Sequence, residues 1–354
     1  MAILCAAGCT TAPAGNNTTA TPASTLVTAA PTATAVANLS NLTIRDELSA
    51  RAVSYAARIS GDNLTLAMAR GPNSTEFGAV QQQLQAIRAG DPQAAYVYTV
   101  EQTDGISRFM VDSEYGQPNG SSPGDLLTYT PTGLPRNVTA PGATGVYTDE
   151  WGTFVSGYAP VRNSTGAMVG LLLVDVRFED LKRMIAGEAV TLAAQVDAGE
   201  LATAIAKGEN STEYRAIADQ LKAIMARDGR IEYINIFEQA NGTARFVADS
   251  EYGTPDASHL GETGIELPSE MPSVVTGAGA TNVYTDRWGT NFTGYAPIRD
   301  AAGKVVAVFR IDMGLQTPAR RRRTSPSPSI FWCSISSLVR PASPPWSPDS
   351  GGTG

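Results

Sequence analysis

A seventeen-residue phrase occurs twice in this chain of 354 residues. Residues 146–162 read VYTDEWGTFVSGYAPVR and residues 283–299 read VYTDRWGTNFTGYAPIR, so twelve of the seventeen positions are identical. The offset is 137 residues, and with no insertion or deletion it also relates two other pairs of residues: Asp112 and Asp249, Asp175 and Asp312. Such a period is too long for a solenoid repeat of about 20–50 residues but fits a whole domain. The chain therefore contains two tandem copies of one globular module.

Composition excludes several classes of function. The net charge of −8 argues against a nucleic-acid partner, because duplex binding depends on a basic surface. The three cysteines, Cys5, Cys9 and Cys333, lie outside both copies, and no Cys/His cluster or phosphate-binding loop is present. His259, the single histidine, is matched by Ser122 in the first copy. We expect no cofactor, no metal and no nucleophile-dependent catalysis, while a hydrolase that uses two carboxylates stays open.

The asparagines indicate a glycosylated protein outside the cytoplasm. Twelve of the fourteen begin an Asn-x-Ser/Thr triplet, where chance would give roughly two or three. The alternative is turn chemistry, since Asn, Ser and Thr also gather in loops. Turn chemistry alone does not explain the preference for Ser or Thr two residues later.

The two ends of the chain differ from the repeats. Residues 1–9 are similar to the end of a lipoprotein signal, which would attach the protein to a membrane by a lipid at Cys9. Residues 10–40, rich in Thr, Ala and Pro, predict a flexible stalk. Residues 315–354 have no counterpart after the first copy, and we interpret them as a disordered or frameshifted tail. A basic segment on a membrane surface is the alternative for the tail.

Each copy reads as helices followed by strands. In the first copy, helical spacing of apolar residues predicts helices within 41–60 and from Asn73 to about residue 90, with Asn73 as the cap. Period-two alternation then predicts five strands: 96–101, 108–112, 146–151, 153–161 and 168–176. We therefore expect an α+β fold with an antiparallel five-stranded sheet in each of two domains, residues 41–177 and 178–314. The loop of about 30 residues before residue 146 is long enough for a binding role.

The repeated phrase, preceded by VDSEYG and followed by a strand that ends in Asp, resembles the Cache group of extracytoplasmic PAS-like sensor domains. The resemblance covers both copies. It implies helices on one sheet face and a small-molecule pocket on the other, roofed by the long loop. It also implies a ligand such as an amino acid, an organic acid or an amine, and either a dimer formed through the N-terminal helices or a separate signalling partner.

Candidate ligand-binding residues come from comparing the copies. Glu150 becomes Arg287, so this position faces water, and strand alternation places its neighbours on the opposite face. The candidates in the first copy are Tyr98, Arg108, Tyr147, Asp149, Trp151, Ser156 and Tyr158. Their counterparts are Asn235, Arg245, Tyr284, Asp286, Trp288, Thr293 and Tyr295. Aromatic rings beside a carboxylate offer contact area and an acceptor for an ammonium group, and an arginine offers a partner for a ligand carboxylate. The alternative is that Trp151 is core and Asp149 caps a turn.

Two interpretations remain from the sequence. The first is an extracytoplasmic sensor region that binds a small polar metabolite and has no catalysis of its own. The second is a structural or adhesive surface glycoprotein whose modules bind nothing. Convergence of Tyr147, Asp149 and Tyr158 on one pocket would favour the first.

Overall fold

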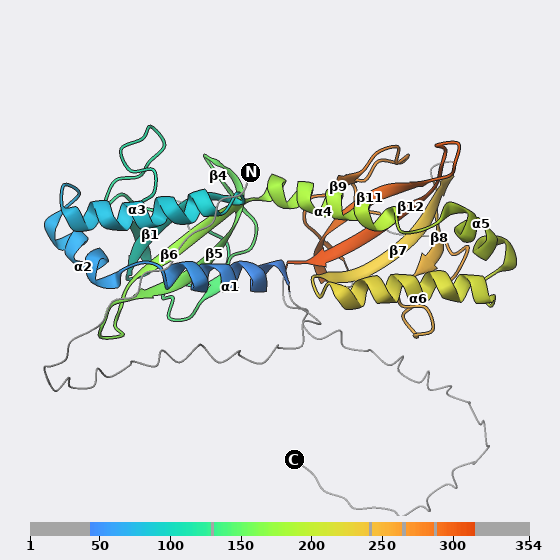
Figure 1. Cartoon of the computed structure of the whole chain (residues 1–354), viewed down its shortest axis with the longest axis horizontal. Helices are drawn as coiled ribbons and strands as arrows, with labels where there is room; N and C mark the ends of the chain where they lie inside the picture. Colours follow the sequence, from blue (N-terminus) through green and yellow to red (C-terminus); the bar gives the residue numbers. More distant parts are fainter. Residues whose placement is uncertain (1–42, 129–130, 241–242, 264–266, 287–288, 316–354) are drawn as a thin grey trace, which may run out of the picture. The chain divides into compact units, whose positions relative to one another are not determined.

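The computed structural model describes residues 43–128, 131–240, 243–263, 267–286 and 289–315. The predicted lipid anchor at Cys9, the stalk, the tail and Trp288 lie outside the described residues, and so does the side chain of Asp286. The described chain forms two modules of α+β structure, α1 to β6 and α4 to β12 (Figure 1).

Three helices begin the first module: α1 Ile44–Ala56, α2 Gly61–Arg70 and α3 Thr75–Gly90. Thr43 and Asp46 form a capping box that starts α1. The second helix was not predicted, because it is short and buries only Leu64 and Ala67 besides its first residue. The predicted cap of α3 was wrong by one residue: the side chain of Ser74, rather than that of Asn73, accepts the hydrogen bond from the Phe77 N–H.

The strands of the first module form one antiparallel sheet. Their bounds are β1 Ala94–Thr103, β2 Ile106–Asp112, β3 Gly142–Ala143, β4 Tyr147–Asp149, β5 Gly152–Arg162 and β6 Met168–Arg177. Five of them lie in the order β2-β1-β6-β5-β3, and β4 pairs with β5 beside this path. The turn of the predicted β1–β2 hairpin is Asp104-Gly105, both at positive φ. The five predicted strands are confirmed as β1, β2, β4, β5 and β6, and the two-residue β3 is an addition.

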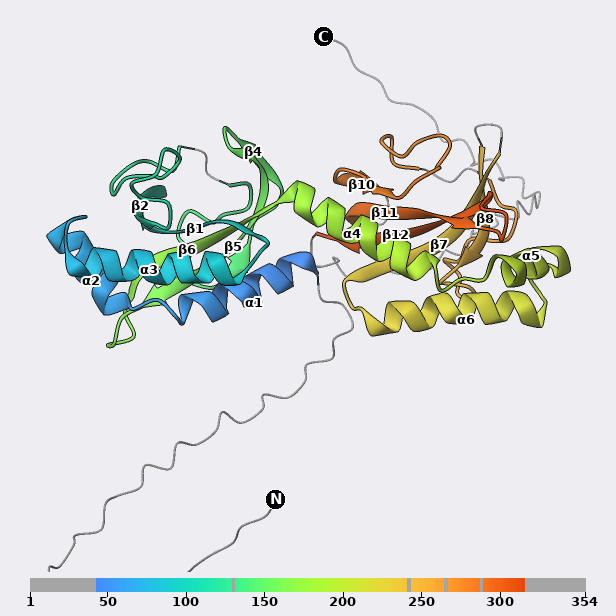
Figure 2. The same cartoon turned by 45° about the horizontal axis from the view of Figure 1, so that its top comes forward.

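The two faces of this sheet are covered differently. Val97, Leu172 and Val174 pack with apolar residues of α1, α2 and α3, whereas Tyr98, Leu171 and Leu173 face Leu134 and Val138 of the long loop. Figure 2 shows the helices on one side of the sheet, and β4 with the loop segments on the other. Alternation along β6 therefore sends 172 and 174 to the helices, and 171, 173 and 175 to the loop face.

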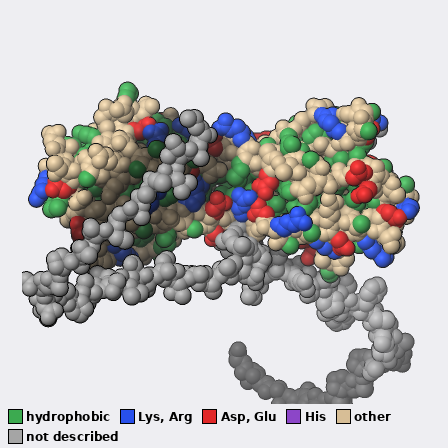
Figure 3. Space-filling model, viewed as in Figure 1, with side chains coloured by type: hydrophobic (Ala, Val, Ile, Leu, Met, Phe, Trp, Pro, Cys, Tyr) green, Lys and Arg blue, Asp and Glu red, His purple; other side chains and the backbone are tan. Residues whose placement is uncertain are grey.

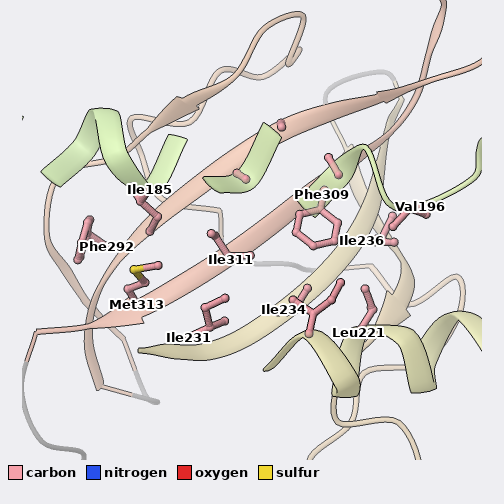
Figure 4. Close-up of a cluster of buried hydrophobic side chains, with 14 of the residues drawn as sticks. Ile185, Val196, Leu221, Ile231, Ile234, Ile236, Phe292, Phe309, Ile311 and Met313 are labelled. Carbon is pink, nitrogen blue, oxygen red and sulfur yellow. The ribbon is translucent and has the colours of Figure 1, made fainter. Parts of the chain in front are cut away.

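The second module repeats this architecture. Its helices are α4 Phe178–Ala193, α5 Ala198–Lys207 and α6 Thr212–Arg227. Its strands are β7 Ile231–Ala240, β8 Thr243–Asp249, β9 Gly279–Ala280, β10 Tyr284–Asp286, β11 Gly289–Arg299 and β12 Val305–Gly314. The sheet order is β10-β11-β12-β7-β8, with β9 paired to β11. Ile185 of α4 and Leu221 of α6 belong to the core cluster that covers one face of β7, β11 and β12 (Figure 4).

The described part of the chain is thus a tandem pair of PAS-like modules. Acidic and basic side chains are interspersed over the described surface that Figure 3 shows. None of the helices in the described ranges has the length and apolar character needed to cross a membrane.

Candidate ligand-binding site

A pocket opens on the loop face of the first module, opposite the helices. Its empty volume is about 450 Å³. It is lined by residues of β1, β2, β4, β5, β6 and the long loop: Tyr96, Tyr98, Phe109, Asp112, Asn119, Ser121, Leu127, Pro131, Tyr147, Asp149, Trp151, Phe154 and Asp175. Four of these residues belong to the loop, at positions 119–131, so the loop contributes to the enclosure, as the Cache resemblance implied.

Asp175 is the buried carboxylate of the pocket. It lies on β6 opposite Ser156 of β5, whose hydroxyl donates to Asp175 Oδ1 at 2.6 Å. The Tyr98 hydroxyl donates to the same oxygen at 3.5 Å, and the Tyr147 hydroxyl lies 2.8 Å from Ser156 Oγ. Burial raises the pKa of Asp175 to about 7, and the hydrogen bonds from Ser156 and Tyr98 offset only part of that rise. The carboxylate is therefore held by neutral hydroxyl groups and lacks compensation for its charge.

Aromatic rings form the wall next to this carboxylate. The ring centroid of Phe154 lies 5.7 Å from that of Tyr96 and 6.0 Å from that of Tyr147. Trp151, 38% exposed, stands at the β4–β5 turn. Rings at these positions present negative π-faces, which attract a desolvated cation.

Two further carboxylates line the pocket, and each is fixed by backbone N–H groups. Asp112 accepts from the N–H groups of Glu114 and Ser121, and Asp149 accepts from those of Trp151 and Gly152. Burial raises the pKa of Asp112, whereas its two backbone hydrogen bonds act in the opposite direction. Within the described ranges no group of His, Cys, Asp and Glu side chains has a geometry suited to a metal ion.

The lining residues, all described, include three carboxylates and no Lys, Arg or His. The nearest basic group on the aromatic wall is Arg177, whose guanidinium lies over the rings of Tyr96 and Phe154 at 5.5 and 5.7 Å. Arg177 is exposed at the end of β6 and is not part of the lining. The pocket therefore offers negative charge and π-faces, which is the environment of a cation.

The residues singled out from the first copy are distributed as follows. Tyr98, Tyr147, Asp149 and Trp151 line the pocket. Ser156 lies beneath it and bonds to Tyr147 and Asp175. Two of the predicted residues lie elsewhere: Tyr158 packs against Gly142 and the apolar cluster of the loop face, and Arg108 is exposed and donates to the Gly124 carbonyl at 3.0 Å. The convergence of Tyr158 with Tyr147 and Asp149 is not found in the lining.

In the second copy, Tyr284 and Thr293 repeat the hydroxyl pair, 2.8 Å apart. Asn235 is fully buried in β7, and Tyr295 packs against Gly279 as Tyr158 does against Gly142. Arg245 is exposed and pairs with Glu238 at 2.5 Å. His259 is exposed as well, with Nδ1 2.8 Å from Glu209 Oε1.

Sequence reasoning gave little weight to the residue at the bottom of the pocket. Neither Asp175 nor Asp112 is among the candidates that the comparison of the copies gave. Asp112 does accept from the turn, but its side chain also lines the pocket. One signal was present: an acid at position 175 interrupts the apolar run of β6, and a buried strand tolerates an acid only when a partner or a ligand compensates it.

The fold and this pocket together define a tandem PAS-like module pair with a pocket in its first member, the architecture that the Cache resemblance implied. No protein-family model and no curated protein matches the sequence.

Among solved structures, the chain is similar to domains of chemoreceptors and of a histidine kinase. The sensory domain of the Campylobacter jejuni chemoreceptor Tlp3 with isoleucine bound is 13% identical, with 75% of this chain and 83% of that chain covered and a TM-score of 0.29. The ligand-binding domain of the Pseudomonas fluorescens chemoreceptor CtaA with L-alanine is 14% identical (77% and 92% covered, TM-score 0.25). The extracellular domain of a histidine kinase, mmHK1S-Z2, is 12% identical (75% and 91% covered, TM-score 0.27). Likeness at this level concerns the fold, and the ligand has to be argued from the pocket.

Proposed function

We propose that the chain is the ligand-binding region of an extracytoplasmic sensor, and that its first module binds a small organic amine in the protonated form. The observation that carries this proposal is the buried carboxylate of Asp175, which faces a pocket with aromatic walls and has only hydroxyl partners of no charge. A bound ammonium group would supply the missing positive charge.

The chemistry of the lining separates amines from the other ligand classes expected from the sequence. An organic acid would bring a further negative charge beside Asp112, Asp149 and Asp175, with no basic residue in the lining to receive it. Like charges that share one desolvated pocket repel each other by several kcal/mol. An α-amino acid would satisfy Asp175 through its ammonium group but would leave its own carboxylate without a basic partner in the lining. Outside the lining, Arg177 at the end of β6 offers such a partner, while Arg88, which also lies over the Tyr96 ring, is paired with Glu114.

An α-amino acid is thus the second candidate ligand, and Arg177 is the observation that favours it. The two candidates differ in one group, the carboxylate, so the cleanest probes are amino acids paired with the amines that remain when the carboxylate is removed. Alanine with ethylamine, valine with isobutylamine and tyrosine with tyramine are such pairs.

The experiment is calorimetric titration of the protein with each pair at pH 8. We expect the amine of a pair to bind more tightly than the amino acid. Asp175→Asn should weaken amine binding by about 2 kcal/mol or more, roughly 30-fold, because it removes the charged partner of a buried ion pair. The matched control is Asp312→Asn in the second module, which should leave this affinity unchanged.

Three results would redirect the proposal. Tighter binding of amino acids, lost in Arg177→Gln, would identify an amino-acid site. Equal weakening by Asp175→Asn and Asp312→Asn would show that the substitutions act through general destabilisation. If the folded protein binds no member of a broad panel of amines and amino acids, the alternative of a structural or adhesive glycoprotein is favoured.

The sensor assignment includes several finer proposals. We infer two domains, 41–177 and 178–314, a lipid anchor at Cys9, glycosylation of exposed asparagines, and signalling through a dimer or a partner protein. Asn73, Asn137 and Asn210 are exposed and suit modification. Asn291 lies buried within β11 at 4% exposure, so its triplet is inaccessible in the folded chain. Mass spectrometry of intact protein from its native host would test the modifications directly.

A further inference from the structure

The second module keeps the acid of the ligand site but changes the residues around it. Asp312 corresponds to Asp175, Thr293 to Ser156 and Tyr284 to Tyr147. Three neighbours differ in kind: Leu173 becomes Arg310, Tyr98 becomes Asn235 and Phe154 becomes Asn291. One of these changes introduces a charge into the strand that carries the acid.

Arg310 occupies the same place in the sheet as Leu173. Leu173 lies opposite Tyr98 of β1 and Tyr158 of β5. Arg310 lies opposite Asn235 of β7 and Tyr295 of β11. Each is two residues before the acid of its strand, so both side chains leave the sheet on the face that carries the acid.

The guanidinium of Arg310 binds the second module's counterparts of the acid and the tyrosine that line the first module's pocket. Its Nε donates to Asp312 Oδ1 at 3.0 Å, and its Nη2 donates to Asp312 Oδ2 at 2.7 Å. Nη2 also donates to the Tyr284 hydroxyl at 2.9 Å. Thr293 Oγ1 donates to Asp312 Oδ1 at 2.5 Å, as Ser156 does to Asp175. The Arg310 and Asp312 side chains are each only 6% exposed.

The change from Tyr98 to Asn235 on the neighbouring strand makes the position beside the acid available to the guanidinium. In the first module the Tyr98 hydroxyl reaches the carboxylate of Asp175. Asn235 is shorter than tyrosine, so no tyrosine hydroxyl at this position competes with the guanidinium for Asp312 Oδ1. Two-atom pairing with the planar guanidinium is the strongest arrangement that a carboxylate forms with a side chain.

We propose that Arg310 is the built-in occupant of a cation site in the second module. The site consists of Asp312, Thr293 and Tyr284, and in the intact chain it is closed to ligands because the chain's own guanidinium fills it. Once Arg310 is truncated, the site takes a free guanidinium or a small alkylammonium ion. This inference rests on the proposed function, because it assumes that the pocket around Asp175 binds cations. It assigns the second module a fixed state that does not depend on a ligand.

The test is chemical rescue with methylguanidinium chloride. Arg310→Ala is prepared in the Asp175→Asn background, which removes the first module's own carboxylate, so that the probe reports on the second module. We expect Arg310→Ala to lower the melting temperature at pH 8, because the truncation leaves Asp312 buried without a partner. Millimolar methylguanidinium chloride should recover most of that loss, whereas equal sodium chloride should not.

Two controls identify the site that the probe occupies. The Asp175→Asn parent, which retains Arg310, should show no stabilisation by methylguanidinium. Adding Asp312→Asn to the Arg310→Ala protein should abolish the rescue, because the site in the second module then has no carboxylate to bind the probe. A rescue that survives Asp312→Asn would overturn the assignment of the site.

The design also covers a variant that does not fold. If Arg310→Ala is unfolded alone, recovery of its near-ultraviolet circular dichroism by methylguanidinium supports the proposal. Failure to recover in the presence of the probe contradicts it. Because the background lacks Asp175, the result does not depend on whether the first module binds an amine, and the two proposals can fail separately.

Discussion

The two modules hold the same acid in two different electrostatic states. In the first, Asp175 meets only hydroxyl groups, and burial raises its pKa to about 7. In the second, Asp312 meets the same kind of hydroxyl groups and, in addition, the guanidinium of Arg310. The second carboxylate therefore carries its compensation within the chain, whereas the first, under the proposed function, takes it from the ligand.

The difference teaches that identity between copies does not mark shared function. Both modules keep three groups. They are Asp175, Tyr147 and Ser156 in the first module and Asp312, Tyr284 and Thr293 in the second. The residue two positions earlier on the same strand differs, leucine in the first module and arginine in the second, and only the arginine pairs with the acid. A buried acid is costly without a partner in either case.

The largest expected effect comes from introducing the Arg310 arrangement of the second module into the first. Leu173→Arg together with Tyr98→Asn places a guanidinium beside Asp175 in the register that Arg310 uses. We expect amine binding to fall by about 100-fold or more, since a tethered cation competes at a high effective concentration. Calorimetry measures the loss. The matched control, Leu173→Met with Tyr98→Asn, has a long uncharged side chain and should keep measurable binding.

The pH dependence of binding is the next largest effect. The carboxyl pKa of Asp175 is raised above its ordinary value, so in the unliganded protein its contribution to stability is present at low pH and is lost as pH rises through about 7. An ammonium ion binds the ionised form. Amine affinity should therefore fall about tenfold per pH unit below 7 and level off above it. A flat profile between pH 5 and 8, measured by titration calorimetry, would contradict the role of Asp175.

The smallest effect concerns the aromatic edge of the pocket. Trp151→Leu should cost about 1 kcal/mol of amine affinity, roughly fivefold, because a partly exposed cation–π contact has about that value. Trp288→Leu is the matching change in the second copy and should leave the affinity unaltered. Equal losses of affinity from Trp151→Leu and Trp288→Leu would contradict the assignment of amine binding to the first module.

The fold was predictable from the sequence because its signals are local and occur twice. The Asp104-Gly105 turn, the apolar run along 168–176 and the long polar loop each follow from local preferences of the residues themselves. The helix α2 escaped prediction, because ten residues with two buried apolar side chains after the first give little periodic signal.

The pocket lining was predictable mainly around β4, with Tyr98 of β1 in addition. Tyr147, Asp149 and Trp151 were found because a charge reversal at position 150 fixed which side faces water. Asp175 and Arg310 depend on pairing between strands that are distant in sequence, 77 residues apart for Tyr98 with Asp175. Such contacts follow from sheet register, which a single sequence does not specify.

The strand that carries Asp175 passes directly into the first helix of the second module. β6 ends at Arg177 and α4 begins at Phe178, so no residue of irregular structure separates strand from helix. Only two residues lie between Asp175 and that helix. A small twist of β6 about its axis therefore reaches Phe178 without a flexible residue to absorb it, and the start of α4 must turn with the strand.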